Sequence, residues 1–240
     1  MPGCLLLFLL LLVTSFPGRA QIGNTMYGYS GLLLTPTAQI HQDGELAFGI
    51  SRIPLLYAPN YHGGSYDRTV LFASMGFLPF LEGTFGFVRP DNMQGGVGDR
   101  TMTARLRLWR QNGWRPALAL GMQDFFAIEE LELEPVSSQH FASTYAVLSH
   151  EIPVSHPLVH QVSAHLGYGT DWLPSNDRHL NGWFGGVRWA PVPQFELMLE
   201  YDSQSINSGI RFFLCSRVQY MFAFWQHRYV MHHLSFSFLL

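Results

Sequence analysis

The sequence predicts an all-β fold, namely an antiparallel transmembrane β-barrel of about 12 strands, and three observations support this prediction. The first is a period of two in hydrophobicity, which recurs from residue 45 to the end of the chain. The second is composition: 48% of the residues are hydrophobic and only 13% are charged, against roughly 25% charged in ordinary soluble domains. The third is an N-terminal apolar run followed by small residues, which is typical of a secretory signal peptide.

The expected signal peptide covers residues 1–20. An apolar run over residues 4–13 is followed by Gly18 and Ala20 at the −3 and −1 positions of the expected cleavage site. We therefore expect a mature chain of residues 21–240 that forms the barrel, with an uncleaved N-terminal helix as the alternative. Elsewhere the chain shows no stretch of the ~20 apolar residues that a membrane-spanning helix needs.

Residues 195–202 give the clearest example of the alternation. One face would carry Phe195, Leu197, Leu199 and Tyr201, and the other Glu196, Met198, Glu200 and Asp202. Such a strand needs an apolar environment on one side and a polar one on the other. A soluble β-sandwich, the main alternative, would bury these carboxylates, and that is costly unless each one is paired.

The chain enters the barrel through two segments without regular alternation. Residues 27–34 are predicted to form either a short strand or the entry to the barrel. Residues 35–42 begin with a Thr-Pro pair, and the sequence leaves open whether they lie inside the barrel as a plug.

The strands of the first half are separated by turn residues or by polar stretches. Residues 69–77 and 81–89 form a predicted hairpin around Pro79, and an Asn-Gly turn follows residues 101–110. An acidic stretch at residues 128–135 is interpreted as a solvated loop rather than a metal site. The strands expected in this half are residues 45–52, 69–77, 81–89, 101–110 and 115–125.

The second half continues the same meander. The strands expected here are residues 141–150, 160–169, 181–189, 195–202, 209–217, 218–227 and 234–240. The last of these alternates Leu and Phe with Ser, as the terminal insertion signal of a barrel does. Twelve strands are expected in total, with ten as the alternative, because single-chain bacterial barrels have even strand numbers.

Charge and cysteine content exclude several other classes of protein. The net charge is −3 and there is no basic patch or run, so nucleic acid is not an expected partner. The predicted mature chain keeps only Cys215, which cannot form an internal disulfide bond. Nothing in the sequence calls for a cofactor or a metal.

A series of short sequence segments indicates a family resemblance. They are Tyr29-Ser30-Gly31-Leu32-Leu33-Leu34-Thr35-Pro36-Thr37-Ala38, Asp43-Gly44-Glu45-Leu46-Ala47-Phe48-Gly49, Pro116-Ala117-Leu118-Ala119-Leu120-Gly121-Met122-Gln123-Asp124, Gly167-Tyr168-Gly169, Asn181-Gly182-Trp183-Phe184-Gly185-Gly186-Val187 and Glu200-Tyr201-Asp202. In this order and spacing the series resembles the YjbH family of outer-membrane proteins linked to exopolysaccharide biosynthesis. The likeness covers most of residues 27–213 and fades afterwards.

The resemblance implies a β-barrel in the outer membrane of a Gram-negative bacterium. Its implied partners are outer-membrane lipids, exopolysaccharide and other envelope proteins of a polysaccharide secretion system, with a role in biofilm. Family members are commonly longer, so the chain is expected to correspond to their N-terminal barrel region. The resemblance implies no catalytic mechanism.

Charged side chains on the predicted lumenal face are the candidate polysaccharide-binding groups. Arginine suits carboxylates because its planar fork donates two parallel hydrogen bonds, and a tryptophan can stack on a sugar ring. The alternative is that ion pairs fill a narrow lumen and only stabilise the wall. The candidates are Arg105, Arg107, Trp109, Glu196, Glu200 and Asp202.

A barrel lipid hydrolase and a general pore are the two other functions considered. A hydrolase needs a serine within hydrogen-bond reach of a histidine. Ser163 and His165 would stand about 7 Å apart along one strand, so the spacing predicts no contact, and Ser149 and His150 point to opposite faces. Cross-strand pairs stay open. We therefore expect a protein without enzymatic activity.

Overall fold

The computed structural model describes residues 22–54, 67–91, 99–125, 142–154, 159–172 and 179–240. The expected signal peptide (residues 1–20) and the acidic stretch at residues 128–135 lie outside these ranges. Within the described ranges, no helix is long and apolar enough to cross a membrane.

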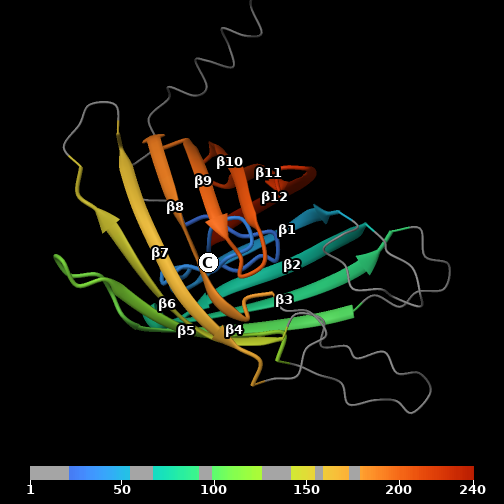
Figure 1. The fold of residues 1–240 in the computed structure, drawn as a ribbon, viewed down its shortest axis with the longest axis horizontal. Coiled ribbons are helices and arrows are strands. Elements are labelled where there is room, and N and C mark those ends of the chain that lie inside the picture. Colours follow the sequence, from blue (N-terminus) through green and yellow to red (C-terminus); the bar gives the residue numbers. More distant parts are fainter. Residues whose placement is uncertain (1–21, 55–66, 92–98, 126–141, 155–158, 173–178) are drawn as a thin grey trace, which may run out of the picture.

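The described residues form twelve strands that close into one antiparallel barrel (Figure 1). Each strand pairs with its neighbours in sequence, and β1 closes the ring against β12, from Glu45 opposite Leu239 to Arg52 opposite His232. The predicted all-β barrel of twelve strands is thus confirmed. The strands are β1 (Glu45–Ile53), β2 (Arg68–Phe77), β3 (Leu81–Pro90), β4 (Asp99–Trp109), β5 (Ala117–Gln123), β6 (Ser143–Ile152), β7 (Gln161–Thr170), β8 (Gly182–Val192), β9 (Phe195–Tyr201), β10 (Ile206–Cys215), β11 (Val218–Trp225) and β12 (Tyr229–Leu239).

The period-two pattern assigns the two faces of the wall correctly. Outward side chains such as Phe48, Leu71 and Leu199 are 44–47% exposed, whereas inward Glu196 and Arg211 are at most 3% exposed. The outer surface is therefore a continuous apolar wall. Soluble monomers rarely expose so much contiguous apolar surface, whereas a barrel in lipid requires it.

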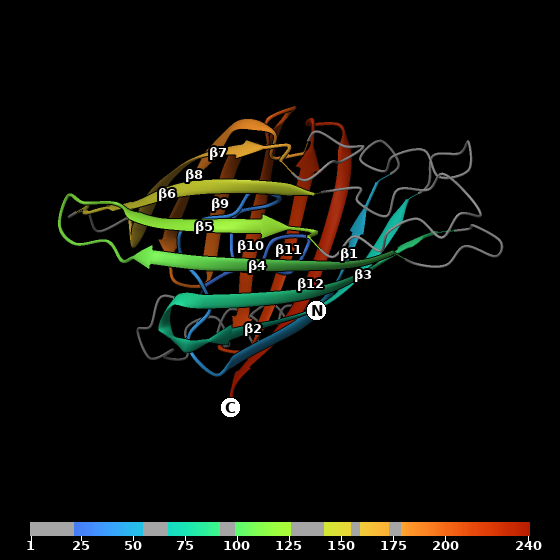
Figure 2. The same ribbon diagram turned by 90° about the horizontal axis from the view of Figure 1, so that it is seen from below.

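The largest difference from the sequence prediction concerns the N-terminal segment. Residues 27–34 do not form a strand of the wall; residues 23–41 fold inside the barrel, where the blue segment of Figures 1 and 2 lies. We call residues 23–41 the plug. Apart from Gln39, these residues are buried, and their regular pairing is limited to isolated bridges, Asn24 with Ser30 and Gly31 with Pro36.

The plug fits inside the barrel because almost all of its side chains are buried against other residues of the chain. Gly28 has a φ of +94°, and a Cβ there would stand 2.2 Å from the Phe72 ring, so glycine fits both the backbone and the space. Tyr29, Leu33 and Leu34 are fully buried. Since no face of the segment is exposed, no alternation marks it in the sequence.

The barrel has two unlike ends. At one end the strands are joined by residues 78–80, 110–116, 153–160, 193–194 and 216–217, and we call this the short-turn end. β1 begins there and β12 finishes there. At the other, long-loop end the connections are residues 54–67, 91–98, 124–142, 171–181, 202–205 and 226–228. In Figure 2 the β4–β5 connection of the short-turn end projects to the left.

Candidate functional site

The plug first packs through apolar side chains. Met26, Leu33 and Tyr29 belong to one buried cluster with methionines and a tryptophan of the wall. The wall members include Met198, Met221, Met231 and Trp225. The lumen is thus filled by a core of its own, and charged wall residues then hold the plug backbone in register.

Glu200 on β9 binds one turn of the plug backbone. Its carboxylate accepts hydrogen bonds from the backbone N–H groups of Leu33 at 3.0 Å, Leu34 at 2.9 Å and Thr35 at 3.1 Å. The Thr35 hydroxyl donates a fourth at 2.8 Å. These four hydrogen bonds satisfy the buried carboxyl group of Glu200 with donors of the plug.

Arg105 on β4 and Glu82 on β3 bind the opposite side of the plug. Their Nη1 and Oε1 atoms are 2.9 Å apart, and both side chains are fully buried. Arg105 also donates to the carbonyls of Ser30 at 2.7 Å and Gln39 at 3.2 Å, and to that of Thr37. Glu82 accepts from the backbone N–H of Ser30. The pair thus connects two wall strands to the plug.

A second ion-pair network joins β8, β9 and β10. The Glu196 carboxylate lies 2.8 Å from Arg211 Nη1 and 3.1 Å from Arg188 Nη1. Arg211 Nη2 donates to the plug carbonyls of Gly31 at 2.8 Å and Asn24 at 3.2 Å. Sequence reasoning missed Arg211, although its place in the β10 alternation marks it as inward.

The six sequence-predicted site residues do not form one site. Arg105 and Glu200 bind the plug directly, and Glu196 pairs with Arg211, which does so. Asp202 lies at the long-loop end, where it accepts from Asn207 Nδ2 at 2.8 Å. Arg107 is half-buried at the short-turn end and donates to the Pro79 carbonyl. Their role in polysaccharide binding stays a prediction.

Trp109 is not free to stack on a sugar with both ring faces. The Arg115 guanidinium lies 4.3 Å from its ring centroid, and its Nε1 donates to the Pro116 carbonyl at 2.8 Å. Trp109 follows an irregularity in the β4–β5 pairing and is half-buried, as Arg107 is.

The predicted separation of Ser163 and His165 is wrong. Ser163 Oγ lies 3.0 Å from His165 Nε2, and His165 Nδ1 lies 2.7 Å from Ser149 Oγ on the neighbouring strand β6. The strand rise gives the distance between the two backbone positions. The His165 imidazole leans along the strand, and this brings its Nε2 within hydrogen-bond distance of Ser163 Oγ. Ser149 also accepts the backbone N–H of Ala38 at 2.6 Å, so the plug covers this cluster.

Burial and neighbouring charge shift the pKa values of two plug residues. Burial raises the pKa of Tyr29 well above its ordinary value, and the nearby Tyr145 adds to this. Burial alone would lower the pKa of His41, but the carboxylates of Glu82 and Glu45 outweigh it and hold that pKa above its ordinary value. At His179, beside the plug, burial lowers the pKa to about 4, partly offset by Asp202.

Three adjoining hollows open at the short-turn end. The first, about 600 Å³, lies between the plug and β4 and is lined by Ile22, Gln39, Ile40, Gln42, Asp43, Pro79, Arg107, Arg110, Arg188 and Leu239. A smaller one of about 210 Å³ shares Gln39, Arg107 and Arg110 with it. We call these two together the arginine hollow.

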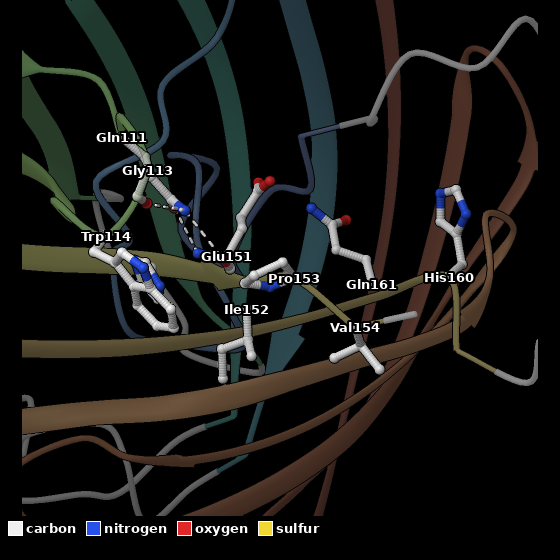
Figure 3. A pocket seen from close by; sticks show the side chains of 10 residues that line it. Gln111, Gly113, Trp114, Glu151, Ile152, Pro153, Val154, His160 and Gln161 are labelled. Carbon is white, nitrogen blue, oxygen red and sulfur yellow. Dashed lines mark hydrogen bonds between the residues drawn. The ribbon is translucent and has the colours of Figure 1, made fainter. Parts of the chain in front are cut away.

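The third hollow, about 710 Å³, adjoins the arginine hollow through Gln111 and Glu151 (Figure 3). Gln111 Nε2 donates to the Glu151 carbonyl at 2.9 Å, and the Glu151 N–H donates back to Gln111 Oε1 at 2.6 Å. Trp114 is 85% exposed at its rim and stacks on His150. Among the described residues no group of three His, Cys, Asp or Glu side chains could hold a metal ion.

Two comparisons with known proteins found a match to this chain. A family model described as "Exopolysaccharide biosynthesis protein YbjH" matches residues 24–209, which is well over half of the chain. A relative in Escherichia coli (strain K12), named "Uncharacterized lipoprotein YjbH", is 28% identical over 120 residues. That match covers 46% of this chain and 16% of the relative's length.

Proposed function

This chain belongs to the YjbH family of exopolysaccharide biosynthesis proteins, and from that premise we propose that it is an outer-membrane β-barrel that takes part in exopolysaccharide secretion without catalysing a reaction. The observation that carries the proposal is the combination of an apolar outer wall with buried, mutually compensated charges inside. Lipid outside and a polar interior are what a bacterial barrel combines.

The unlike ends of the barrel support one orientation. Bacterial outer-membrane barrels have short periplasmic turns and longer extracellular loops. The short-turn end, with the arginine hollow and both ends of the strand meander, would then face the periplasm. Partner envelope proteins and a nascent polymer would meet the barrel at that end.

A general pore is the second candidate, and the plug argues against it. The interior between β4, β9 and β10 is occupied by residues 23–41, which the charged groups of three strands hold in place. A small solute would have to displace a hydrogen-bonded, apolar core. We therefore favour a role in which the barrel presents its ends to partners or polymer.

A lipid hydrolase is the third candidate. The Ser149–His165–Ser163 cluster has the contacts of a nucleophile and a base. However, the groups that touch it are the plug N–H of Ala38 and the Arg188 guanidinium, whereas a triad needs a carboxylate to orient the imidazole. The cluster is better explained as a buried polar contact between wall and plug.

The test begins with membrane fractionation and gel migration of the mature protein with and without heating. We expect outer-membrane location and a faster unheated form. Deletion of the gene should then change surface polysaccharide or biofilm without changing the uptake of small solutes, and the intact gene should restore it. A soluble protein, or unaltered polysaccharide in the deletion strain, would contradict the proposal.

A further inference from the structure

We propose that the arginine hollow is a binding site for the carboxylate of an acidic sugar, a uronate, with Arg107 and Arg110 as the groups that bind it. The inference rests on the proposed function, whose polymer it assigns to a chemical class. It places the contact with the polymer at the short-turn end of the barrel. Most of the polysaccharide-binding residues predicted from sequence lie instead in the buried lumen.

The positive charge of the hollow comes from arginines that line it. Arg107 and Arg110 are close together at the end of β4, and Arg188 reaches the hollow from β8. Asp43 and Glu151 are the acidic residues that line the hollow, and Asp43 accepts the Leu78 N–H at 2.8 Å. Within the described part of the chain, neither Arg107 nor Arg110 forms an ion pair. Three arginines against two carboxylates leave the lining of the hollow with one surplus positive charge.

Arg188 supplies an independent observation that points to a ligand. Its side chain is 5% exposed, and its Nη1 pairs with Glu196 at 3.1 Å. Its Nη2, in contrast, has no hydrogen-bond partner among the described residues, and the Glu151 carboxylate lies 4.0 Å away. A buried guanidinium donor without an acceptor is costly, and an anion in the hollow would compensate it.

The arginines buried in the barrel have fewer free hydrogen-bond donors than Arg107 in the arginine hollow. Arg105 and Arg211 already donate to a carboxylate and to several plug carbonyls. Arg107 donates to a single carbonyl, that of Pro79, so most of its planar fork remains for a ligand. Carboxylates match that fork because they accept two parallel hydrogen bonds.

The surroundings fit a sugar better than an isolated ion. The larger part of the hollow is about 600 Å³, within the size range of small-molecule sites. Gln39 and Gln111 line the adjoining space with amides that can bind hydroxyls. The hollow in Figure 3 extends the surface toward the exposed Trp114, whose indole offers an apolar face next to polar groups. Neighbouring sugars of a chain have room there.

The experiment is calorimetric titration of the folded full-length mature protein in a neutral detergent. The probe is the trimer of galacturonic acid, and the matched probe is its carboxyl-reduced, neutral counterpart. We expect the acidic trimer to bind and the neutral trimer to bind about tenfold more weakly or worse. R107Q and R110Q should each weaken the acidic trimer about tenfold.

The matched control is R217Q, an exposed arginine in the β10–β11 turn at the same end that does not line the hollow. It should leave binding unchanged, and heat-dependent migration confirms that each variant is folded. Arg110 is exposed, so R110Q keeps the test open if R107Q does not fold. Equal binding by R110Q and the unaltered protein, or equal binding of the two trimers, overturns the proposal.

Two further experiments distinguish a uronate site from a site for phosphate or for a lipid headgroup. Inorganic phosphate should displace the acidic trimer only in large excess; displacement at equal concentration would mean a general anion site and would overturn the sugar assignment. Nanodiscs with phosphatidylglycerol should bind the trimer as well as neutral nanodiscs do, and loss of binding there would mean a lipid headgroup site. The purified protein could fail to bind the trimer while deletion of its gene still alters surface polysaccharide. That result would refute the uronate site and leave the proposed function standing.

Discussion

Glu82 and Arg105 form a fully buried ion pair across β3 and β4, with 2.9 Å between Oε1 and Nη1. Both side chains also hydrogen-bond the plug, Glu82 at the Ser30 N–H and Arg105 at the Ser30 carbonyl. The wall and the plug are therefore parts of one polar network. Removing one charge leaves the other buried without its partner.

Glu82→Gln should lower the free energy of unfolding by about 3–5 kcal/mol, the usual cost of breaking one side of a buried pair. Denaturant unfolding in detergent, followed by gel migration, measures it. Arg52→Gln is the control, because Arg52 pairs with Asp67 at 3.1 Å while 61% exposed, and should cost at most about 1 kcal/mol. An equal loss in both variants would show that the buried network does not stabilise the fold.

Glu200→Ala should loosen the plug rather than the wall. It removes the acceptor of the Leu33, Leu34 and Thr35 N–H groups, and an unsatisfied buried donor costs about 1–3 kcal/mol. Hydrogen exchange should accelerate at residues 33–35 and stay slow in β6. Arg52→Gln is the control, because Arg52 pairs with Asp67 and Asp91 outside the plug. Uniform acceleration through the barrel would instead indicate global destabilisation.

The strands could be predicted from sequence because each wall residue has one environment outside and another inside. That contrast gives a period of two, and it located all twelve strands. It was weakest at β12, which begins at Tyr229 rather than at residue 234. There His232 is on the outer face and His233 is buried, so adjacent histidines hide the alternation.

The plug and its contacts could not be predicted in the same way. Leu32, Leu33 and Leu34 are all buried, so they form an apolar run without a period and resemble a strand. The inward direction of Arg105 and Glu200 follows from alternation, but their partners are plug backbone groups, which have no signature in the sequence. Arg188 and Glu196 are eight residues apart and meet only because β8 and β9 are adjacent.

The plug also predicts the electrical behaviour of the barrel. In planar bilayers the unaltered protein should show little conductance, since residues 23–41 fill the interior. Glu200→Ala combined with Glu82→Gln removes anchors on two sides of the plug, and open events should become more frequent. Arg52→Gln serves as the control. Large, steady conductance from the unaltered protein would mean that the lumen is a pore and that the plug leaves it readily.

His41 gives the barrel a pH-dependent contact. Its Nε2 lies 2.7 Å from Asn24 Oδ1 and its Nδ1 lies 3.4 Å from Glu45 Oε1, so a protonated ring can donate to Asn24 and form an ion pair with Glu45. Burial opposes the charge, but Glu82 and Glu45 outweigh it and raise the pKa of His41 above its ordinary value. In the unfolded chain the pKa returns to about 6.5.

Because the folded protein holds this proton more tightly, the contribution of His41 is fully present below about pH 6.5 and is lost as the pH rises through the raised pKa. The free energy of unfolding should therefore fall above pH 6.5 in the unaltered protein and fall less in His41→Gln. The difference between the two curves isolates this group, since all other titrating residues are shared. If the free energy of unfolding falls equally with pH in both proteins above pH 6.5, the His41 imidazole does not contribute through its protonation.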